Sequence, residues 1–191
     1  MGAPRLRIVR QCSELGQWEA VFREPDPRLR PWLHGWYQGY VESRASTFRR
    51  RELPHPGVML IFNFGAALRV IDPRNPRSGD AVRSFVAGLF DSYVITDSEG
   101  PFEGIELVLS PLGAFRLLGL PQDSLVNRVI DLEALWGAPA HRLEGQLREM
   151  ASWEERFALL DQLLVARLET SRRPSAGVTW AWEQLRRSGG C

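Results

Sequence analysis

The sequence predicts an α+β chain in which an antiparallel β-barrel or sandwich is followed by a helical segment. Six to eight short runs with strand character, separated by turn residues, fill the region before Ser110 with no helical stretch between them. At Ser110–Pro111 the apolar spacing changes from the repeat of strands to the longer repeat of helices. With 191 residues, the chain is long enough for one good core, or for one domain with an appendage.

The N-terminal residues are expected to form an arm, residues 1–28, that packs as a strap onto the core. A short apolar set would form one or two amphipathic turns, and prolines would stop any helix there. These apolar residues are Leu15, Trp18, Val21 and Phe22, and the prolines are Pro25 and Pro27. A ligand-gated arm is the functional alternative.

The predicted barrel covers residues 29–110, and its first strand spans 32–43. Alternation places Trp36, Gln38 and Tyr40 on one face of that strand. An arginine run, Arg49 to Arg51, follows, and Arg50 is expected to point opposite to its two neighbours. Whichever side faces inward offers guanidinium groups suited to carboxylate or phosphate.

The central strand is expected at Val58–Phe64, the longest apolar run in the chain, broken only by Asn63. Leu60, Phe62 and Phe64 share one face, while Met59, Ile61 and Asn63 share the other. The sequence does not decide which face meets a ligand and which meets the helices. Further strands are expected at 68–71, 82–89, 93–96 and 102–109.

The helical segment, residues 111–170, begins with Ser110 as N-cap and Pro111 at the first helical position. Shorter helical pieces lead to one helix over 138–150 and another that opens with a capping box, Ser152 to Glu155. The helix that opens with this capping box has a wide apolar stripe. Two interpretations of the stripe, burial on the sheet and contact with a second chain, are equally open. The stripe comprises Phe157, Leu160, Leu164 and Leu168.

Composition excludes several classes of function. The net charge of +1, from 24 basic and 23 acidic residues, provides no global field for a polyanion. Every basic residue is arginine, so no lysine can form a Schiff base or serve a P-loop. The two cysteines, Cys12 and Cys191, form no disulfide framework, and no signal peptide or membrane-length apolar run is present. We therefore expect a cytoplasmic protein with no membrane contact.

No catalytic constellation, metal site or cofactor motif emerges from the sequence. The three histidines, His34, His55 and His141, are too scattered for a metal cage. Gly-x-Ser-x-Gly, Gly-x-Gly-x-x-Gly and P-loop patterns are absent. Glu103 and Glu106 lie three apart on a strand and so point to opposite faces. We expect no metal, no cofactor and no enzyme activity.

Two blocks of the sequence stand out, namely Pro54–Gly65, and Ser110–Pro121 followed by Leu125–Leu132. Together they resemble the N-terminal sensor domain of AraC-type bacterial transcription regulators. The similarity runs from roughly Leu29 to Leu168, and residues 178–190 resemble the first helix of that family's DNA-binding domain. Residues 171–191 are accordingly interpreted as a linker and the start of a domain that is missing here.

The resemblance implies a cupin-like barrel or jelly roll that binds a small-molecule effector, followed by helices that form a homodimer. DNA would be contacted only through the missing C-terminal domain. The aromatic candidates for the pocket predict a planar or hydrophobic ligand. The candidate ligand-binding residues are Trp36, Tyr40, Arg51, Phe62, Phe64, Phe85, Phe90 and Glu106. The candidate dimer contacts are the four residues of the helical stripe.

Two other functions remain open at this point. The barrel alone is compatible with a metal-free cupin-like isomerase or lyase, which needs an acid/base pair in an enclosed pocket. A metal-dependent cupin enzyme is disfavoured because no His-x-His pair occurs. The second of these hypotheses is a stand-alone protein that sequesters a ligand.

Overall fold

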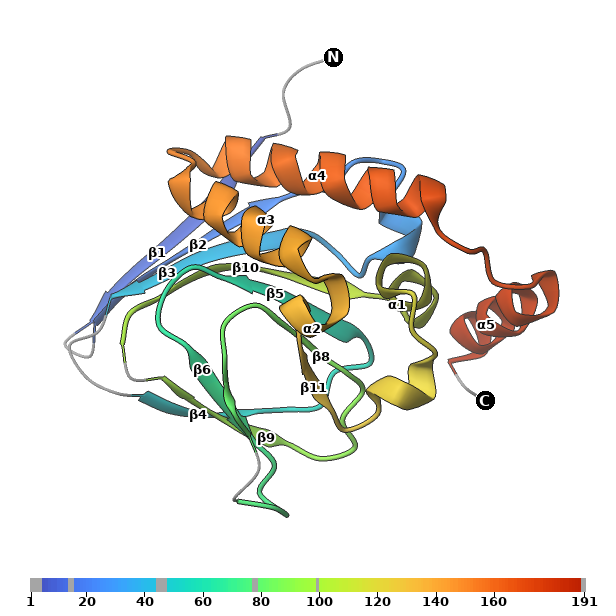
Figure 1. Cartoon of the computed structure of the whole chain (residues 1–191), viewed down its shortest axis with the longest axis horizontal. Coiled ribbons are helices and arrows are strands. Elements are labelled where there is room, and N and C mark those ends of the chain that lie inside the picture. Colours follow the sequence, from blue (N-terminus) through green and yellow to red (C-terminus); the bar gives the residue numbers. More distant parts are fainter. Residues whose placement is uncertain (1–4, 14–15, 44–47, 77–78, 99, 190–191) are drawn as a thin grey trace.

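The computed structural model describes residues 5–13, 16–43, 48–76, 79–98 and 100–189. Two antiparallel sheets face each other, and helices cover the outer face of the larger one (Figure 1). The larger sheet has seven strands in the order β1 (Arg7–Ser13), β2 (Gly16–Arg23), β3 (Tyr37–Ser43), β10 (Phe102–Leu109), β5 (Val58–Asn63), β8 (Phe85–Ala87) and β11 (Val129–Asp131). The smaller sheet has the order β4 (Phe48–Glu52), β9 (Val94–Ser98), β6 (Leu68–Ile71) and β7 (Ala81–Val82).

The α-helices follow the barrel in the chain. They are α1 (Pro111–Leu118), α2 (Leu132–Trp136), α3 (Ala138–Glu149), α4 (Trp153–Thr170) and α5 (Ala176–Ser188). One 3₁₀ turn, η1 (Arg30–Trp32), precedes β3, and another, η2 (Gln122–Leu125), follows α1. The α+β prediction, with an antiparallel barrel or sandwich before the helices, is confirmed.

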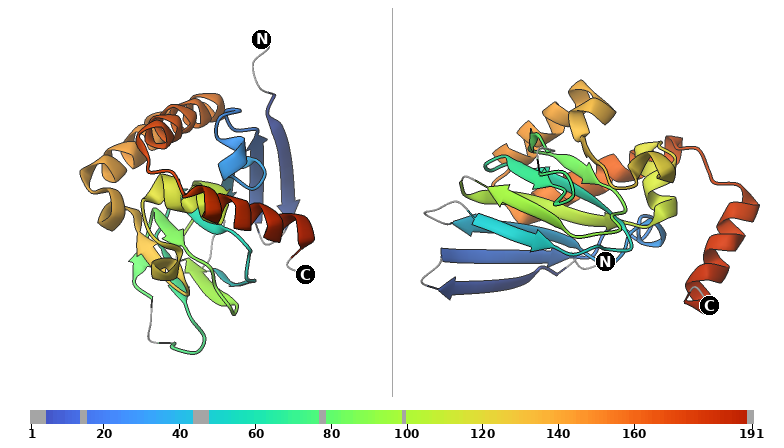
Figure 2. Two further views of the ribbon diagram at one scale, coloured as in Figure 1. Left: turned by 90° about the vertical axis from the view of Figure 1, so that its right-hand side faces the viewer. Right: turned by 90° about the horizontal axis from the view of Figure 1, so that it is seen from below.

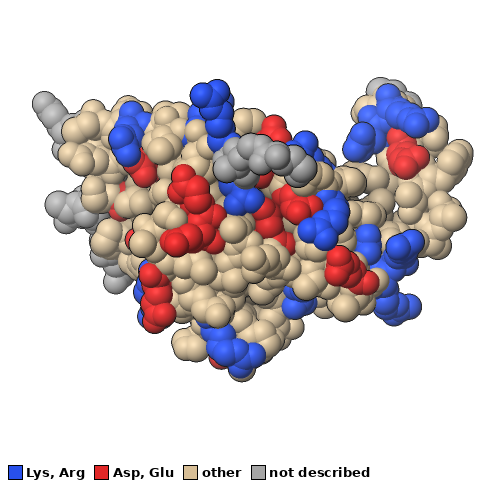
Figure 3. Space-filling view, turned by 90° about the horizontal axis from the view of Figure 1, so that it is seen from above, with Lys and Arg blue, Asp and Glu red and all other residues tan. Residues whose placement is uncertain are grey.

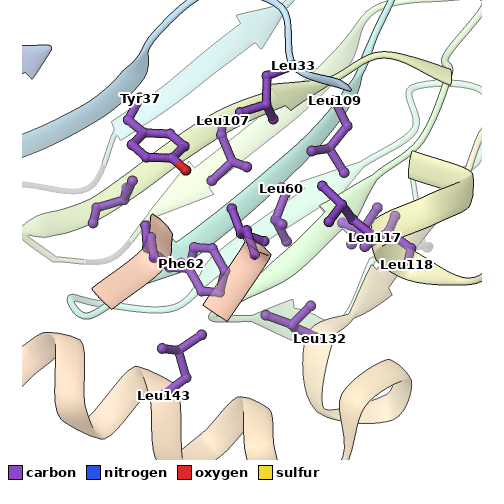
Figure 4. Packing of buried hydrophobic residues seen from close by; sticks show 14 of the residues in the cluster. Leu33, Tyr37, Leu60, Phe62, Leu107, Leu109, Leu117, Leu118, Leu132 and Leu143 are labelled. Carbon is purple, nitrogen blue, oxygen red and sulfur yellow. The ribbon is translucent and has the colours of Figure 1, made fainter. Parts of the chain in front are cut away.

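The main core lies between the seven-stranded sheet and the helices α3 and α4. Leu60 and Phe62 of β5 and Leu107 of β10 point towards Leu143 of α3 in this layer (Figure 4). Close packing needs a glycine at one point, because a Cβ on Gly39 would come within 2.5 Å of the Trp153 ring. This core fixes α4 against the sheet and leaves the opposite sheet face to the barrel interior.

Asn63 interrupts the apolar run of β5 for a structural reason. Its side chain is buried, donates to the Ala66 carbonyl at 2.7 Å and accepts from the Gly65 amide at 2.9 Å. Asn63 therefore closes the turn after β5, and both the nitrogen and the oxygen of its own side-chain amide are hydrogen-bonded.

Four expectations differ from the structure. The first strand, expected over 32–43, begins at Tyr37, and Arg30–Trp32 form the turn η1. The N-terminal arm is not helical but an antiparallel hairpin, β1–β2, that extends the large sheet beside β3 (Figure 2). The expected strand 82–89 is two strands, β7 and β8, which belong to different sheets. The region 111–170 also contributes β11 to the large sheet, so it is not purely helical.

The helix α5 stands away from the barrel, beyond the segment that follows α4 (Figures 1 and 2). None of its residues is buried. Val178, Trp180 and Leu185 are 53%, 64% and 55% exposed, which makes this helix the most open apolar element that the described residues contain.

Candidate ligand-binding site

A cavity of about 370 Å³ lies between the two sheets, inside the barrel. Its walls come from both sheets and from the segment between β4 and β5. The lining residues are Trp18, Ala20, Gln38, Tyr40, Glu42, Arg50, Glu52, Leu53, Pro54, His55, Gly57, Met59, Ile61, Leu68, Val70, Phe85, Ala87, Gly88, Phe90, Ser92, Val94, Thr96, Phe102 and Glu106. This volume, with mostly apolar walls and a few polar groups, is typical of small-molecule sites.

Strand alternation explains how the large sheet supplies its half of the wall. In register across four strands, Gln38 of β3 pairs with Glu106 of β10, then Ile61 of β5, then Phe85 of β8. Residues directly opposite on antiparallel strands share a face, so all four side chains enter the cavity together. Glu106 thus has the amide of Gln38 on one side and an apolar residue on the other.

An aromatic platform lies further along the same face. The rings of Tyr40 and Phe102 stack with centroids 4.7 Å apart and an interplanar angle of 10°. Glu42 is opposite Phe102 in the β3–β10 register and is also directed to the cavity. This part of the wall therefore combines a flat aromatic surface with a carboxylate.

The small sheet contributes Arg50, Glu52 and Thr96 to the opposite wall. Arg50 forms an ion pair with Glu42, so the two sheets are joined by a charge-assisted hydrogen bond inside the barrel. Thr96 donates its hydroxyl to Glu52 at 3.1 Å. Glu52, Leu53 and His55 are exposed and therefore mark the mouth of the cavity.

Burial changes the acid–base behaviour of two cavity residues. Desolvation, with the charge of Glu52 as a second cause, raises the pKa of Glu106 to about 7. Desolvation and the neighbouring carboxylates Glu106 and Glu42 raise the pKa of Tyr40 well above its ordinary value. Glu106 is thus balanced between its neutral and charged forms near neutral pH, while Tyr40 stays a neutral phenol.

Four of the predicted pocket residues line the cavity, namely Tyr40, Phe85, Phe90 and Glu106. That they bind a ligand stays a prediction. The other four predicted residues lie elsewhere, and each has a physical reason.

Trp36 and Arg51 are at the surface. Gly35 has a positive φ of 80°, so the chain turns before β3 begins at Tyr37, and Trp36 is left 43% exposed outside the sheet. Arg51 is exposed and stacks over the Tyr93 ring at 4.5 Å. The predicted alternation in β4 holds, but Arg50 is the arginine that points inward.

Phe62 and Phe64 belong to the helix side of the sheet. Phe62 is fully buried and lies 6.2 Å from the Trp136 ring, centroid to centroid. Phe64 is buried in the same cluster, with the Arg156 guanidinium 5.2 Å above its ring. The cavity face of β5 carries Met59 and Ile61 instead.

The predicted dimer stripe on α4 is also buried within the chain. Phe157, Leu160 and Leu164 have no exposed surface and Leu168 is 7% exposed, because all four pack in the core between α4 and the sheet. The sequence left two interpretations open, burial on the sheet and contact with a second chain. For these four residues, burial on the sheet is correct.

Sequence reasoning missed Gln38, Glu42, Arg50 and Phe102 as cavity residues. A usable signal existed for three of them, because Gln38 and Glu42 share strand parity with Tyr40, and Phe102 shares it with Glu106. Arg50 lacked such a signal, since its placement depends on the pairing of β4 with the distant strand β9.

Neither a metal cluster nor a membrane-spanning helix occurs in the described ranges. There, no group of three or more histidine, cysteine, aspartate or glutamate residues is arranged to hold a metal ion. Within the same part of the chain, no helix combines the length and apolarity needed to cross a bilayer. On the face seen from above, positive and negative side chains intermingle (Figure 3).

Comparison with known proteins gives a distant structural likeness and one family. Oxalate decarboxylase of Lactobacillus farciminis, in a formate complex, is 15% identical with a TM-score of 0.32, covering 53% of this chain and 30% of that one. The 7S globulin of Momordica charantia is 14% identical with a TM-score of 0.34, covering 75% and 44%. Hazelnut (Corylus avellana) vicilin is 13% identical with a TM-score of 0.34, covering 84% and 50%.

The chain thus spans half or less of the length of these three structures. No curated protein matches the sequence. A family model described as a domain of unknown function, DUF6597, matches residues 22–131, a range that runs from β2 to β11 and encloses most of the cavity wall. The chain belongs to the DUF6597 family.

Proposed function

We propose that this chain is a small-molecule receptor domain, and that it serves as the effector-sensing part of an AraC-type transcription regulator in the cytoplasm. The observation that carries the receptor function is the cavity of about 370 Å³ between the sheets, with its buried polar groups. The regulator reading is supported by the two sequence blocks, Pro54–Gly65 and Ser110–Pro121. The exposed free thiol of Cys12 fits a reducing compartment.

A direct covalent and hydrogen-bonded route links the cavity to the C-terminal segment. β10 carries Glu106 into the cavity and runs into Ser110, which caps α1 through the Gly113 amide at 3.0 Å. At the end of α1, Arg116 donates to the Leu168 carbonyl at 2.6 Å and to the Ser171 hydroxyl at 2.9 Å. A ligand that shifts β10 would therefore act on the end of α4, where the segment leading to α5 begins.

DNA contact and dimerisation belong to the same proposal but to other surfaces. The chain as a whole carries a net charge of only +1, so DNA contact is assigned to a further domain of the regulator. Pairing of subunits is assigned to surfaces other than the buried α4 stripe. Sedimentation of the full-length regulator, with and without ligand, measures that pairing.

A fragment screen by thermal shift tests the receptor function, because a ligand that binds only the folded state raises the melting temperature. The specificity control is Ala87→Trp, which places an indole in the cavity from β8. The matched control is Ala134→Trp on the exposed surface of α2. We expect hits that are lost in the first variant and kept in the second; hits that persist in Ala87→Trp, or no hits, contradict a receptor cavity.

The coupling is tested by hydrogen exchange of the segment from Ser171 to Ser188, using a fragment from that screen. We expect ligand to change exchange there in the native chain and not in Arg116→Ala, which lacks the donor to Leu168 and Ser171. Arg142→Ala, an exposed position on α3, serves as the control. Equal responses in both variants would contradict the route through α1.

A second candidate function is a metal-free isomerase or lyase, and one observation favours it. Glu106 lies in an enclosed site with a pKa raised to about 7, which is the range of an effective general base. The test is deuterium uptake at an acidic carbon of a cavity-bound fragment in D₂O, followed by NMR. Uptake that disappears in Glu106→Gln supports catalysis, and absence of uptake favours the receptor alone.

A further inference from the structure

Several polar groups in the cavity have unused hydrogen-bonding capacity. The Glu42 side chain is 10% exposed, and its Oε2 is buried without a hydrogen-bond partner among the described residues. Glu106, the Tyr40 hydroxyl and the Gln38 amide also make no hydrogen bond with any part of the chain that the structure describes. Since buried polar groups in native proteins are usually paired, a partner from outside the chain is the simplest account.

Negative charge exceeds positive charge around these groups. Three carboxylates, Glu42, Glu52 and Glu106, line the cavity, whereas the guanidinium of Arg50 is already in an ion pair with Glu42. A ligand carboxylate placed here would meet Glu52 and Glu106 as like charges at low dielectric. A ligand cation would instead find a carboxylate, Glu106, with no counter-ion among the described residues.

The aromatic wall reinforces the same preference. The stacked rings of Tyr40 and Phe102 lie on the cavity face beside Glu42, and Phe85 lies in the same row as Glu106. Ring faces attract cations, and their broad surface fits a flat apolar group. The cavity therefore offers an acidic group, Glu106, within an aromatic and aliphatic enclosure.

We propose that the cavity binds an organic amine: a protonated nitrogen that pairs with Glu106 beside Gln38 and Tyr40, attached to a planar apolar body that lies on the Tyr40–Phe102 platform. This rests on the proposed receptor function and narrows it to one ligand class. The amine hydrogens can be donated to the carboxylate oxygens of Glu106, which accept no hydrogen bond from the described part of the chain. An alcohol of the same shape fills the same space but leaves Glu106 without a counter-ion.

Matched ligand trios test the proposal. Tryptamine, tryptophol and indole-3-propionic acid share a body and differ in the terminal group, as do the corresponding naphthyl and phenyl series. By calorimetry at pH 8 we expect each amine to bind about tenfold tighter than its alcohol, which corresponds to one buried ion pair, and each acid to bind most weakly. Glu106→Gln should remove the advantage of the amine over the alcohol, while Glu149→Gln on the surface of α3 should keep that advantage.

Other outcomes separate the two proposals. If acids or alcohols bind as tightly as amines, and Ala87→Trp abolishes their binding, the receptor function stands and the amine class is overturned. An amine preference that survives in Glu106→Gln also overturns it, because the carboxylate then plays no part. If no member of any trio binds, the amine proposal falls, and the fragment screen decides the receptor function by itself.

Discussion

The two faces of the seven-stranded sheet are built from the same strands, yet they differ in the hydrogen bonding of their polar side chains. On the helix face, Tyr37 donates to Asp161 at 2.9 Å and Arg23 forms an ion pair with the same carboxylate, although Arg23 Nε has no hydrogen-bond partner among the described residues. On the cavity face, three residues along the same strand, Tyr40 has no such partner in the described ranges. Both tyrosines come from β3.

This difference separates structure from function within one sheet. Paired polar groups and close packing on the helix face stabilise the chain, even though Trp136 Nε1 and Arg156 Nε are buried there without a hydrogen-bond partner among the described residues. Unpaired groups and an open volume on the other face lower stability. Proteins keep such destabilising features at sites that must bind a ligand. Changes at matched positions on the two faces test this contrast.

Leu164→Glu should have the largest effect. Leu164 has no exposed surface in the core between α4 and the sheet, and burying a lone carboxylate there costs on the order of the whole stability of a domain, about 5 kcal/mol or more. We expect loss of the folded circular dichroism spectrum, with the exposed Gln162→Glu as an unaffected control. A variant that stays folded and only dissociates a dimer would restore α4 as a subunit interface.

The neighbours Leu60 and Ile61 compare the two faces on one strand. Leu60 is fully buried beneath the helices, whereas Ile61 borders the existing cavity. Leu60→Ala opens a new void and should cost about 4 kcal/mol, while Ile61→Ala enlarges a space already present and should cost about 2 kcal/mol. Urea unfolding measures both, and equal losses would mean that the cavity face is packed as tightly as the core.

Glu106→Gln should raise stability in a pH-dependent way. Because the folded pKa, about 7, exceeds the unfolded value of 4.5, the native protein binds the extra proton between these values and loses stability as pH rises through them. The cost is absent below pH 4.5 and reaches about 3 kcal/mol above pH 7, where Glu106 is ionised opposite Glu52.

The neutral amide introduced by Glu106→Gln lacks this titration, so the variant should melt higher than the native chain at pH 8 and at the same temperature at pH 4.5. The other ionisable groups that line the cavity, among them Glu42, Arg50, Glu52 and His55, are present in both proteins, and repulsion from Glu52 is part of the cost that the variant removes. Scanning calorimetry across this pH range checks the slope. A difference between the two proteins that does not vary with pH would show that Glu106 titrates as an ordinary surface carboxyl.

Local sequence signals predicted the elements that local physics determines. Ser110 caps α1 and Ser152 opens α4 with a capping box, as expected, because both caps involve residues three apart. The strands 68–71 and 102–109 have the expected bounds, since short alternating runs between turn residues suffice to define them.

The errors concern long-range pairing. The arm was expected to be helical, but β1 and β2 form because β3 offers an edge from Tyr37 to Ser43. The alternation predicted for β5 was correct, since Phe62 and Ile61 lie on opposite faces. Which face is the interior of the barrel was left open, because only the position of α4 decides it. Candidate site residues chosen by aromatic character alone therefore included Phe62 and Phe64.

The two tyrosines of β3 should show the smallest effect and the most direct one. Tyr37→Phe removes the hydroxyl that donates to Asp161, so the part-buried carboxylate loses one hydrogen bond. We expect the free energy of unfolding to fall by about 1–2 kcal/mol. Tyr40→Phe removes a hydroxyl with no partner among the described residues, so it should be neutral within about 0.5 kcal/mol or slightly stabilising.

Ligand affinity should change more in Tyr40→Phe than in Tyr37→Phe, because only Tyr40 faces the cavity. Urea unfolding and calorimetry with tryptamine measure the two properties on the same samples. If Tyr37→Phe weakens binding more than Tyr40→Phe does, the two faces are energetically coupled and do not divide structure from function.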